Sequence, residues 1–325
     1  MKNARVRRMP AFCVLALALA GCGSGQGAPG IPGAGFVSQA ATARSEASRV
    51  RQARSKVAGD LLYVGGDRES YVFTYPQGKL VEELPLGSFG MCADRSGNVY
   101  FTGVRTITEY AHGATEPIAS YTVGGTAFSC AADIETGRLA VVVLCISGCK
   151  GDEVAIFDHP GAPPTTYQDP AMKSMLYCGF DGHGNLYVDG YSGSTVTVAE
   201  LPAGSATFTD YPVLQQVVNP GQIQWDTRHI TLEERFHPVI YRLSFTPLGA
   251  QVKDTVALQQ EGVRAAQSWI FGNAIAIPNG PATKRPLDIR IWAYPKGGTP
   301  MQILSHFIPR FREIDGVAFS AAPAR

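Results

Sequence analysis

The fold is decided by a short stretch that occurs three times with little change. It reads CGFDGHGNLYV at 178–188, GMCADRSGNVYF at 90–101 and CAADIETGRLAV at 130–141. Each copy is an apolar run, a polar turn that begins with Asp, and a second apolar run. An Asp side chain can close such a turn, and Gly accepts the positive φ of a tight hairpin. Weaker copies follow at 225–232 and 272–277, so we predict five β-hairpins of one kind.

A second element follows each hairpin, and one further copy of this element lies before the first hairpin. It is a β-rich run that ends in an aromatic residue or Leu and continues into a Pro/Gly turn. Its six copies lie at 71–78, 107–113, 154–161, 196–204, 241–249 and 289–297, and their turn glycines are 35, 48, 43, 45 and 48 residues apart. Hairpin and second element together make four strands in about 45 residues, the period of a β-propeller blade. The strands are apolar almost throughout, which indicates that neighbouring blades cover both faces.

The two ends of the repeat region complement each other. Residues 315–320 look like a first strand without a successor, and residues 60–65 look like a second strand without a predecessor. Pairing of 61–64 with 317–319 would complete a blade and remove two free sheet edges. We therefore predict an all-β, six-bladed propeller of four-stranded antiparallel blades over residues 59–325.

The pattern over residues 60–320 resembles the six-bladed NHL/TolB-like propeller superfamily, which includes gluconolactonase-type enzymes. The resemblance implies the fold but not an activity, because this architecture serves lactonases, lyases, peptide binders and scaffolds. A WD40 propeller fits less well. The Gly-His and Trp-Asp pair does not recur from blade to blade, since each dipeptide occurs once, at 182–183 and 225–226, and Trp225, Trp269 and Trp292 do not fall at one blade position.

The amino terminus has the composition of an export signal. Four basic residues precede an apolar run at 11–20 that is too short to span a bilayer. The sequence LAGC at 19–22 resembles a bacterial lipobox, which implies that Cys22 is lipidated and becomes the first mature residue. An ordinary secretory peptide is the alternative. We expect residues 1–21 to be the signal and the protein to be anchored to the cell envelope, in the outer membrane if the cell is Gram-negative.

Residues 22–58 form a separate segment in composition. The part to residue 35 is rich in Gly, Pro and Ala, as in a flexible tether. The remainder could be a short helix, a basic arm along anionic headgroups, or a solvated spacer. The formal net charge of +1 is the sum of +4 in the signal, +4 in this linker and −7 in the propeller. A nucleic-acid partner is therefore not expected for the propeller, and we expect a monomer.

Motifs for catalysis and metal binding are sparse. Gluconolactonase-type propellers hold a divalent ion with carboxylates and Asn at the starts of the innermost strands, but here only Glu313 and Asp315 offer carboxylates at such positions. The Asp residues of the hairpin turns are better explained as turn caps. No Gly-x-Ser-x-Gly or His-Glu-x-x-His motif occurs. We predict no metal and no cofactor, and the sequence points to no catalytic residue.

Propellers bind ligands mainly where loops surround the channel mouth. We predict ligand contacts there from Arg105, Tyr191, Gln222, Gln224, Arg264, Gln267, Arg312, Glu313 and Asp315. Their mixed polarity favours a non-catalytic module that binds or scaffolds a protein or a small polar ligand. A lactonase- or lyase-type enzyme that uses the channel mouth is the alternative. A purely structural surface protein is a third hypothesis.

The remaining cysteines allow several arrangements. A local disulfide between Cys145 and Cys149 would close a loop in an exported protein. Cys92, Cys130 and Cys178 lie on innermost strands. Alternation of side chains across a strand allows Cys92 and Cys130 to meet between blades. Three small buried hydrophobes are the competing interpretation, and a thiolate metal site is the least supported.

Overall fold

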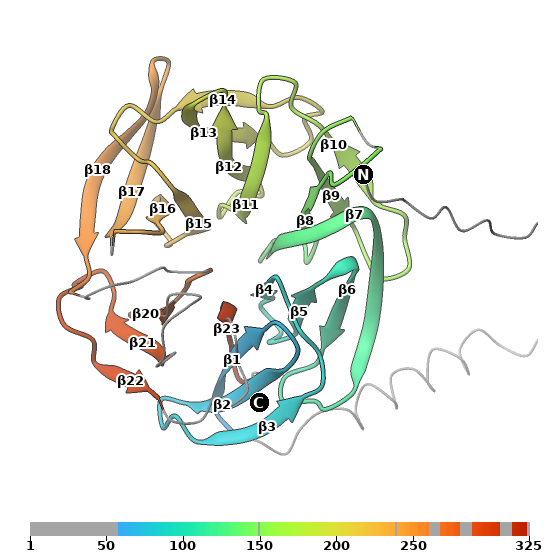
Figure 1. Cartoon of the computed structure of the whole chain (residues 1–325), viewed down its shortest axis with the longest axis vertical. Coiled ribbons are helices and arrows are strands. Elements are labelled where there is room, and N and C mark those ends of the chain that lie inside the picture. Colours follow the sequence, from blue (N-terminus) through green and yellow to red (C-terminus); the bar gives the residue numbers. More distant parts are fainter. Residues whose placement is uncertain are drawn as a thin grey trace, which may run out of the picture. The chain divides into compact units, whose positions relative to one another are not determined.

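The computed structural model describes residues 58–148, 150–237, 239–259, 267–279, 288–305 and 314–323. They all belong to the second of two compact units, Arg44–Arg325. The described part is all-β and has a propeller arrangement of antiparallel sheets around a centre (Figure 1). None of the described residues form a helix long and apolar enough to cross a bilayer. The signal, Cys22 and the linker to residue 57 lie outside the described residues.

Four sheets have four strands each. The first contains, from the centre outward, β23 (Ile314–Ser320), β1 (Asp60–Gly66), β2 (Ser70–Tyr75) and β3 (Leu80–Leu84). The second contains β11 (Ser174–Phe180), β12 (Leu186–Ser192), β13 (Thr195–Leu201) and β14 (Thr209–Pro212). The third contains β15 (Pro220–Trp225), β16 (Ile230–Glu234), β17 (Val239–Thr246) and β18 (Gly249–Ala257). The fourth contains β19 (Trp269–Phe271), β20 (Ala274–Asn279), β21 (Asp288–Ala293) and β22 (Gln302–Leu304).

The fifth sheet has seven strands, so the prediction of six separate four-stranded sheets is met only in part. Its strands are β4 (Gly90–Ala93), β5 (Val99–Thr102), β6 (Val104–Tyr110), β7 (Pro117–Ala132), β8 (Leu139–Leu144), β9 (Glu153–Phe157) and β10 (Thr165–Tyr167). The 16-residue β7 pairs with β6 through its first part and with β8 through its second. The chain between these parts contains Gly124 and Gly125 but no Pro, Asn or Asp that would end the strand.

The predicted closure between the two ends of the repeat region is present. Leu61, Leu62, Tyr63 and Val64 pair antiparallel with Ser320, Phe319, Ala318 and Val317. The innermost strands then contact one another in the cyclic order β23, β4, β7, β11, β15, β19 and back to β23. This pairing satisfies two sheet edges that would otherwise be open.

The core lies between neighbouring sheets. Alternate side chains of a strand point to opposite faces, so each strand contributes to the core on both of its sides. In β1, Leu62 and Val64 pack toward β20 and β21, whereas Leu61 and Tyr63 pack toward β4, β5 and β6. All four side chains are at most 1% exposed. The near-continuous apolar character of the strands therefore reflects burial on two faces.

The hairpin turns are closed as predicted by their Asp side chains. Asp94 accepts a hydrogen bond from Asn98 N, and Asp133 accepts one from Glu135 N. Asp181 and Asp226 accept from backbone N–H groups two to four residues further on. These carboxylates are structural caps that satisfy the turn backbone.

The cysteines of the innermost strands divide into a bonded pair and a free thiol. Cys92 on β4 and Cys130 on β7 form a disulfide that joins two neighbouring innermost strands. Cys178 on β11 is free and buried, and burial raises the pKa of its thiol to about 12. Cys145 is also disulfide-bonded, while its predicted partner Cys149 lies outside the described residues.

Candidate functional site

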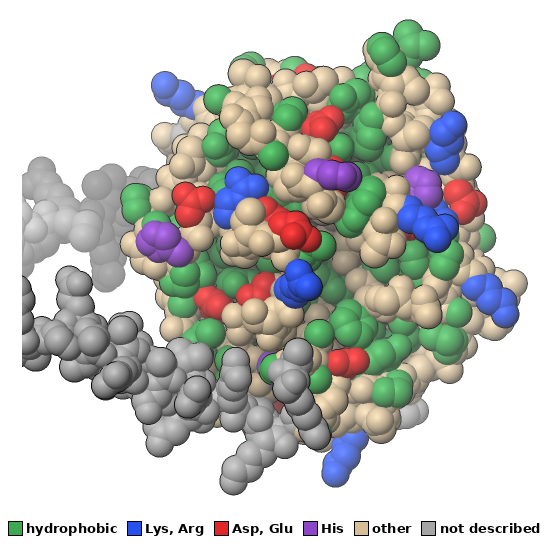
Figure 2. All heavy atoms as spheres, turned by 180° about the vertical axis from the view of Figure 1, so that it is seen from behind, with side chains coloured by type: hydrophobic (Ala, Val, Ile, Leu, Met, Phe, Trp, Pro, Cys, Tyr) green, Lys and Arg blue, Asp and Glu red, His purple; other side chains and the backbone are tan. Residues whose placement is uncertain are grey.

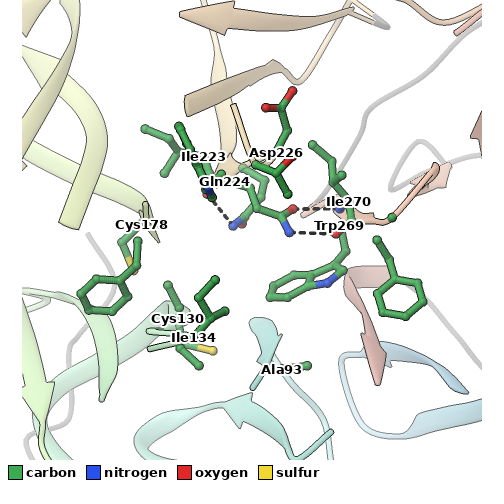
Figure 3. Close-up of a pocket in the computed structure, with 18 of the residues that line it drawn as sticks. Ala93, Cys130, Ile134, Cys178, Ile223, Gln224, Asp226, Trp269 and Ile270 are labelled. Atoms are coloured by element: carbon green, nitrogen blue, oxygen red, sulfur yellow. Dashed lines mark hydrogen bonds between the residues drawn. The ribbon is translucent and has the colours of Figure 1, made fainter. Parts of the chain in front are cut away.

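A cavity of about 480 Å³ lies at the centre of the ring, at the end where the innermost strands finish. We call it the central cavity. Its walls come from β4, β7, β11, β15 and β19 and the turns that follow β7, β15 and β19. Its size falls in the range of small-molecule sites, about 300–1,000 Å³. Figure 3 shows several of the lining side chains, which include Ala93, Cys130, Ile134, Cys178, Ile223, Gln224, Asp226, Trp269 and Ile270.

One position of the repeat lines the cavity in five innermost strands. It is the residue directly before the turn, and it is occupied by Ala93, Ala132, Phe180, Trp225 and Phe271. Three consecutive innermost strands therefore contribute an aromatic ring, while two contribute only a methyl group. The aromatic residues at this position therefore belong to β11, β15 and β19, and the alanines to β4 and β7.

Trp269 is the most central of the aromatic side chains. It packs against three separate hydrophobic clusters, those around β1 and β20, around β7 and β8, and around β4 and β5. It is half-buried and its remaining surface lines the cavity (Figure 3). A flat indole face held from several sides is a rigid platform for a planar or apolar group.

Two polar side chains of the cavity are fully engaged within the protein. Gln224 donates from Nε2 to Ile270 O at 2.9 Å and accepts at Oε1 from Ile270 N at 2.8 Å (Figure 3). It thereby links β15 to β19 as a strand would. Asp226 accepts from Arg242 Nε and Tyr294 OH, each at 2.6 Å, besides the two backbone N–H groups of its turn.

The charge state of Asp226 follows from these contacts. Burial favours the neutral acid, but hydrogen bonds from Tyr294, from the turn backbone and from Arg242 outweigh it and lower the pKa of Asp226. The Arg242 guanidinium also lies 5.6 Å from the centre of the Tyr294 ring. Asp226 is thus a stable anion with its acceptors occupied, which suits a structural role better than proton transfer.

Gln222 differs from Gln224 in that only one end of its side-chain amide is hydrogen-bonded among the described residues. Its Nε2 donates to Ile223 O at 2.9 Å, and this carbonyl fixes the orientation of the amide because only the NH₂ end can face it. The other end, Oε1, is buried and accepts no hydrogen bond within the described part of the chain. Gln222 is 3% exposed and lines the central cavity.

Two buried carboxyl groups lie behind Gln222, toward the end where the innermost strands begin. Glu233 on β16 accepts at Oε2 from Gln222 N and Ser268 N, each at 3.3 Å. Asp189 on β12 accepts at Oδ1 from Tyr177 N at 2.7 Å. Their second oxygens, Glu233 Oε1 and Asp189 Oδ2, have no partner among the described residues.

Burial dominates the acidity of both groups. It raises the pKa of Glu233 to about 7, against hydrogen bonds from Ser268 and the positive charge of Arg235. It raises the pKa of Asp189 well above its usual range, and the neighbouring Glu233 charge acts in the same direction. Burial thus raises the pKa of both carboxyl groups, whereas the pKa of Asp226 is lowered.

A second hollow, of about 400 Å³, lies at the end where the innermost strands begin. It is lined by Asp67, Phe89, Val104 and Asp315, among others. Phe89 and Val104 are 41% and 66% exposed. Its lining includes two carboxylates, Asp67 and Asp315, and one aromatic residue, Phe89.

The structure distributes the sequence-predicted contact residues over several places. Gln222 and Gln224 come together in the central cavity. Gln267 is completely buried and exchanges two hydrogen bonds of 2.6 Å with the backbone of Met91, and its own N–H donates to Asp315 O. The remaining described residues lie apart from the cavity: Asp315 in the second hollow, Arg105 exposed on β6, and Tyr191 bonded through its hydroxyl to Val218 O. Arg264, Arg312 and Glu313 lie outside the described residues.

Sequence reasoning did not identify the aromatic lining. The feature of the sequence that could have revealed this lining is the residue before each turn. Phe180, Trp225 and Phe271 occupy that position, which holds Ala in two other blades. Among the described residues, no group of three or more His, Cys, Asp or Glu side chains is placed to hold a metal ion. The face seen in Figure 2 mixes hydrophobic, acidic, basic and His side chains.

Comparison with known proteins supports the fold alone. No protein-family profile matches the sequence, and no curated protein is significantly similar to it. A Bacteroides caccae protein of unknown function is 14% identical, with a TM-score of 0.59 over 81% of this chain and 99% of that chain. The β-propeller domain of Myceliophteria thermophila Cps50 (Swd1) is 8% identical, with a TM-score of 0.51 over 79% of this chain and 86% of that chain. The chain therefore has a β-propeller fold.

Proposed function

We propose that this chain is a lipid-anchored protein of the cell envelope whose propeller is a non-catalytic binding module. Its ligand is a small, mainly apolar molecule held in the central cavity. The observation that carries this proposal is a cavity of about 480 Å³ with Trp269 at its centre and aromatic residues of three consecutive innermost strands in its lining. This shifts the ligand from the polar class expected at the channel mouth to an apolar class.

We also propose that the ring is a six-bladed propeller of the NHL/TolB-like kind. The seven-stranded sheet then counts as two blades that share β7, and the cyclic contacts of six innermost strands support that count. The proposed anchor rests on the LAGC sequence at 19–22 and the short apolar run before it. Mass spectrometry of the mature amino terminus should find acylated Cys22, and any other terminal residue would contradict the anchor.

A lactonase or lyase reaction is less well supported at this site. Asp226 is the one ionisable carboxyl group among the described lining residues, and four donors occupy its oxygens. A general acid or base needs a free site within reach of substrate. The aromatic walls and engaged polar groups favour retention of a ligand over its conversion.

Binding is tested with indole as the probe, because its flat ring matches the Trp269 platform. Isothermal titration of the purified full-length chain should give saturable binding. Replacing Trp269→Ala should weaken it at least tenfold, through loss of roughly 1.5 kcal/mol of aromatic contact. The matched control is Phe89→Ala, which removes an aromatic ring at the opposite end and should leave affinity unchanged. Equal losses in both variants, or no binding at all, would contradict the proposal.

A further inference from the structure

One hairpin turn at the central cavity has an unusual backbone. Each of the five turns that join a first strand to a second strand contains a residue with positive φ. In four of these turns the residue is a glycine with φ between 56° and 84°, namely Gly97, Gly137, Gly184 and Gly272. In the turn after β15 it is Thr227, with φ of 75°.

The left-handed conformation is unfavourable for Thr227. In this conformation its Cβ crowds the following carbonyl oxygen, whereas glycine has no Cβ. A β-branched residue is a genuine outlier there. Such residues persist where the surrounding structure maintains them, and they cluster at ligand sites. Since glycine serves in the other four turns, the benefit of the Thr227 side chain must lie outside the backbone of the turn.

Thr227 lies at the solvent-open part of the central cavity. Cys130, Cys178 and Ile223 line the inner part and are completely buried. By contrast, Thr227 and Asn273, which stand on the turns after β15 and β19, line the cavity and are exposed. Their side chains make no hydrogen bond within the described part of the chain. The cavity therefore has a mainly apolar inner part and a rim with free polar groups.

The cost of the Thr227 backbone and its place on the rim have one explanation. We infer that Thr227 determines ligand specificity, and that its hydroxyl hydrogen-bonds a hydroxyl or amide group at one end of the ligand. A threonine hydroxyl both donates and accepts, so it suits either group. The inference rests on the proposed binding function and specifies its ligand class. The ligand has an apolar ring, which lies against Trp269, and a hydrogen-bonding group that stays at the rim.

The ligand class is tested with tryptophol (indole-3-ethanol) and 3-propylindole, titrated against the purified full-length chain. The two probes share a ring and a side-chain length, and they differ in a terminal hydroxyl or methyl group. Thr227→Val keeps the β-branched shape and removes the hydroxyl. It should weaken tryptophol binding about fivefold, the effect of one neutral hydrogen bond, and leave 3-propylindole binding within about twofold. Thr227→Ser keeps the hydroxyl and should keep tryptophol affinity within about twofold.

The stability of the chain supplies a second readout. Thr227→Gly removes the crowded Cβ, so it should raise the unfolding temperature by about 2–4 °C while it weakens tryptophol binding about fivefold. The matched control is Arg105→Gly, at the other described residue besides glycine that has positive φ, 59°. Arg105 is exposed on β6, apart from the cavity. This control should leave the affinity for both probes within about twofold.

Three results would overturn the role of Thr227: equal weakening of both probes by Thr227→Val, unchanged tryptophol binding by that variant, or a lower unfolding temperature for Thr227→Gly. The cavity function still stands in each case if both probes bind the unsubstituted chain and Trp269→Ala weakens them. If neither probe binds the unsubstituted chain, the proposed function fails as well. If Thr227→Val does not fold, as seen by circular dichroism, Thr227→Ser and Thr227→Gly decide, because only the second should lose tryptophol affinity.

Discussion

The hairpin formed by β15 and β16 has buried carboxyl groups at both ends, and two of them, Asp226 and Glu233, behave in opposite ways. Asp226, in the turn, accepts four hydrogen bonds and has a lowered pKa. Glu233, at the far end of β16, accepts two long ones and has a pKa raised to about 7. Burial opposes ionisation at both places, so the number and kind of donors decide the outcome. The hairpin thus separates a structural anion beside the cavity from a proton-binding group behind it.

The largest effect should follow loss of the Asp226 anion. Asp226→Asn leaves Arg242 without its close partner at 2.6 Å and turns an amide toward donor groups. We expect the free energy of unfolding to fall by about 4 kcal/mol at pH 7, typical of breaking a buried ion pair. Because the folded pKa is lowered, the loss should shrink as pH falls through that value. Urea unfolding measures both.

A control separates this buried contact from ordinary surface charge. Asp254 also pairs with Arg242, at 3.2 Å, but its side chain is 57% exposed. Asp254→Asn should therefore cost less than about 1 kcal/mol, as surface ion pairs do. Similar costs for the two variants would contradict the distinction between a buried cap and a surface pair.

Glu233 should give the second largest effect, and with the opposite pH dependence. The folded chain binds this proton more tightly than the unfolded chain, whose carboxyl titrates near 4.5. Stability should therefore fall as pH rises from about 4.5 through about 7, by about 3 kcal/mol for this group. Glu233→Gln should remove that decline and stabilise the chain at pH 8. Stability curves of the two chains that stay parallel from pH 4 to 8 would contradict the account.

A smaller effect should distinguish the two glutamines of β15. Gln224→Met leaves the Ile270 N–H and C=O without their partners, so we expect a loss of about 2 kcal/mol in stability. Gln222→Met removes one hydrogen bond to Ile223 O and relieves an unpartnered oxygen, and should cost less than about 1 kcal/mol. Thermal unfolding of both variants measures the difference. A larger loss for Gln222→Met than for Gln224→Met would contradict this ranking.

The repeat was sufficient to predict much of the fold. Pairing of Leu61–Val64 with the carboxyl-terminal strand follows from two incomplete blades, and the turn Asp caps follow from short-range chemistry. The fusion of two blades through β7 was not predicted. The lack of Pro, Asn or Asp between Tyr121 and Thr126 is only a weak indication that one strand continues through this stretch.

The candidate site was harder to predict than the fold. Gln222 and Gln267 lie at similar places in the repeat. Gln222 is among the residues that line the cavity and its amide oxygen has no partner in the described part of the chain, whereas Gln267 bonds to Met91. That difference depends on contacts between blades far apart in sequence. The aromatic residues before the turns looked like ordinary core positions, because periodicity does not tell which strand ends face a cavity.

The most direct test of the central claim is a crystal structure of the chain with bound indole. We predict density for the ring against Trp269 in the central cavity. Density at the second hollow beside Phe89 and Asp315, with the central cavity empty at saturating indole, would contradict the claim.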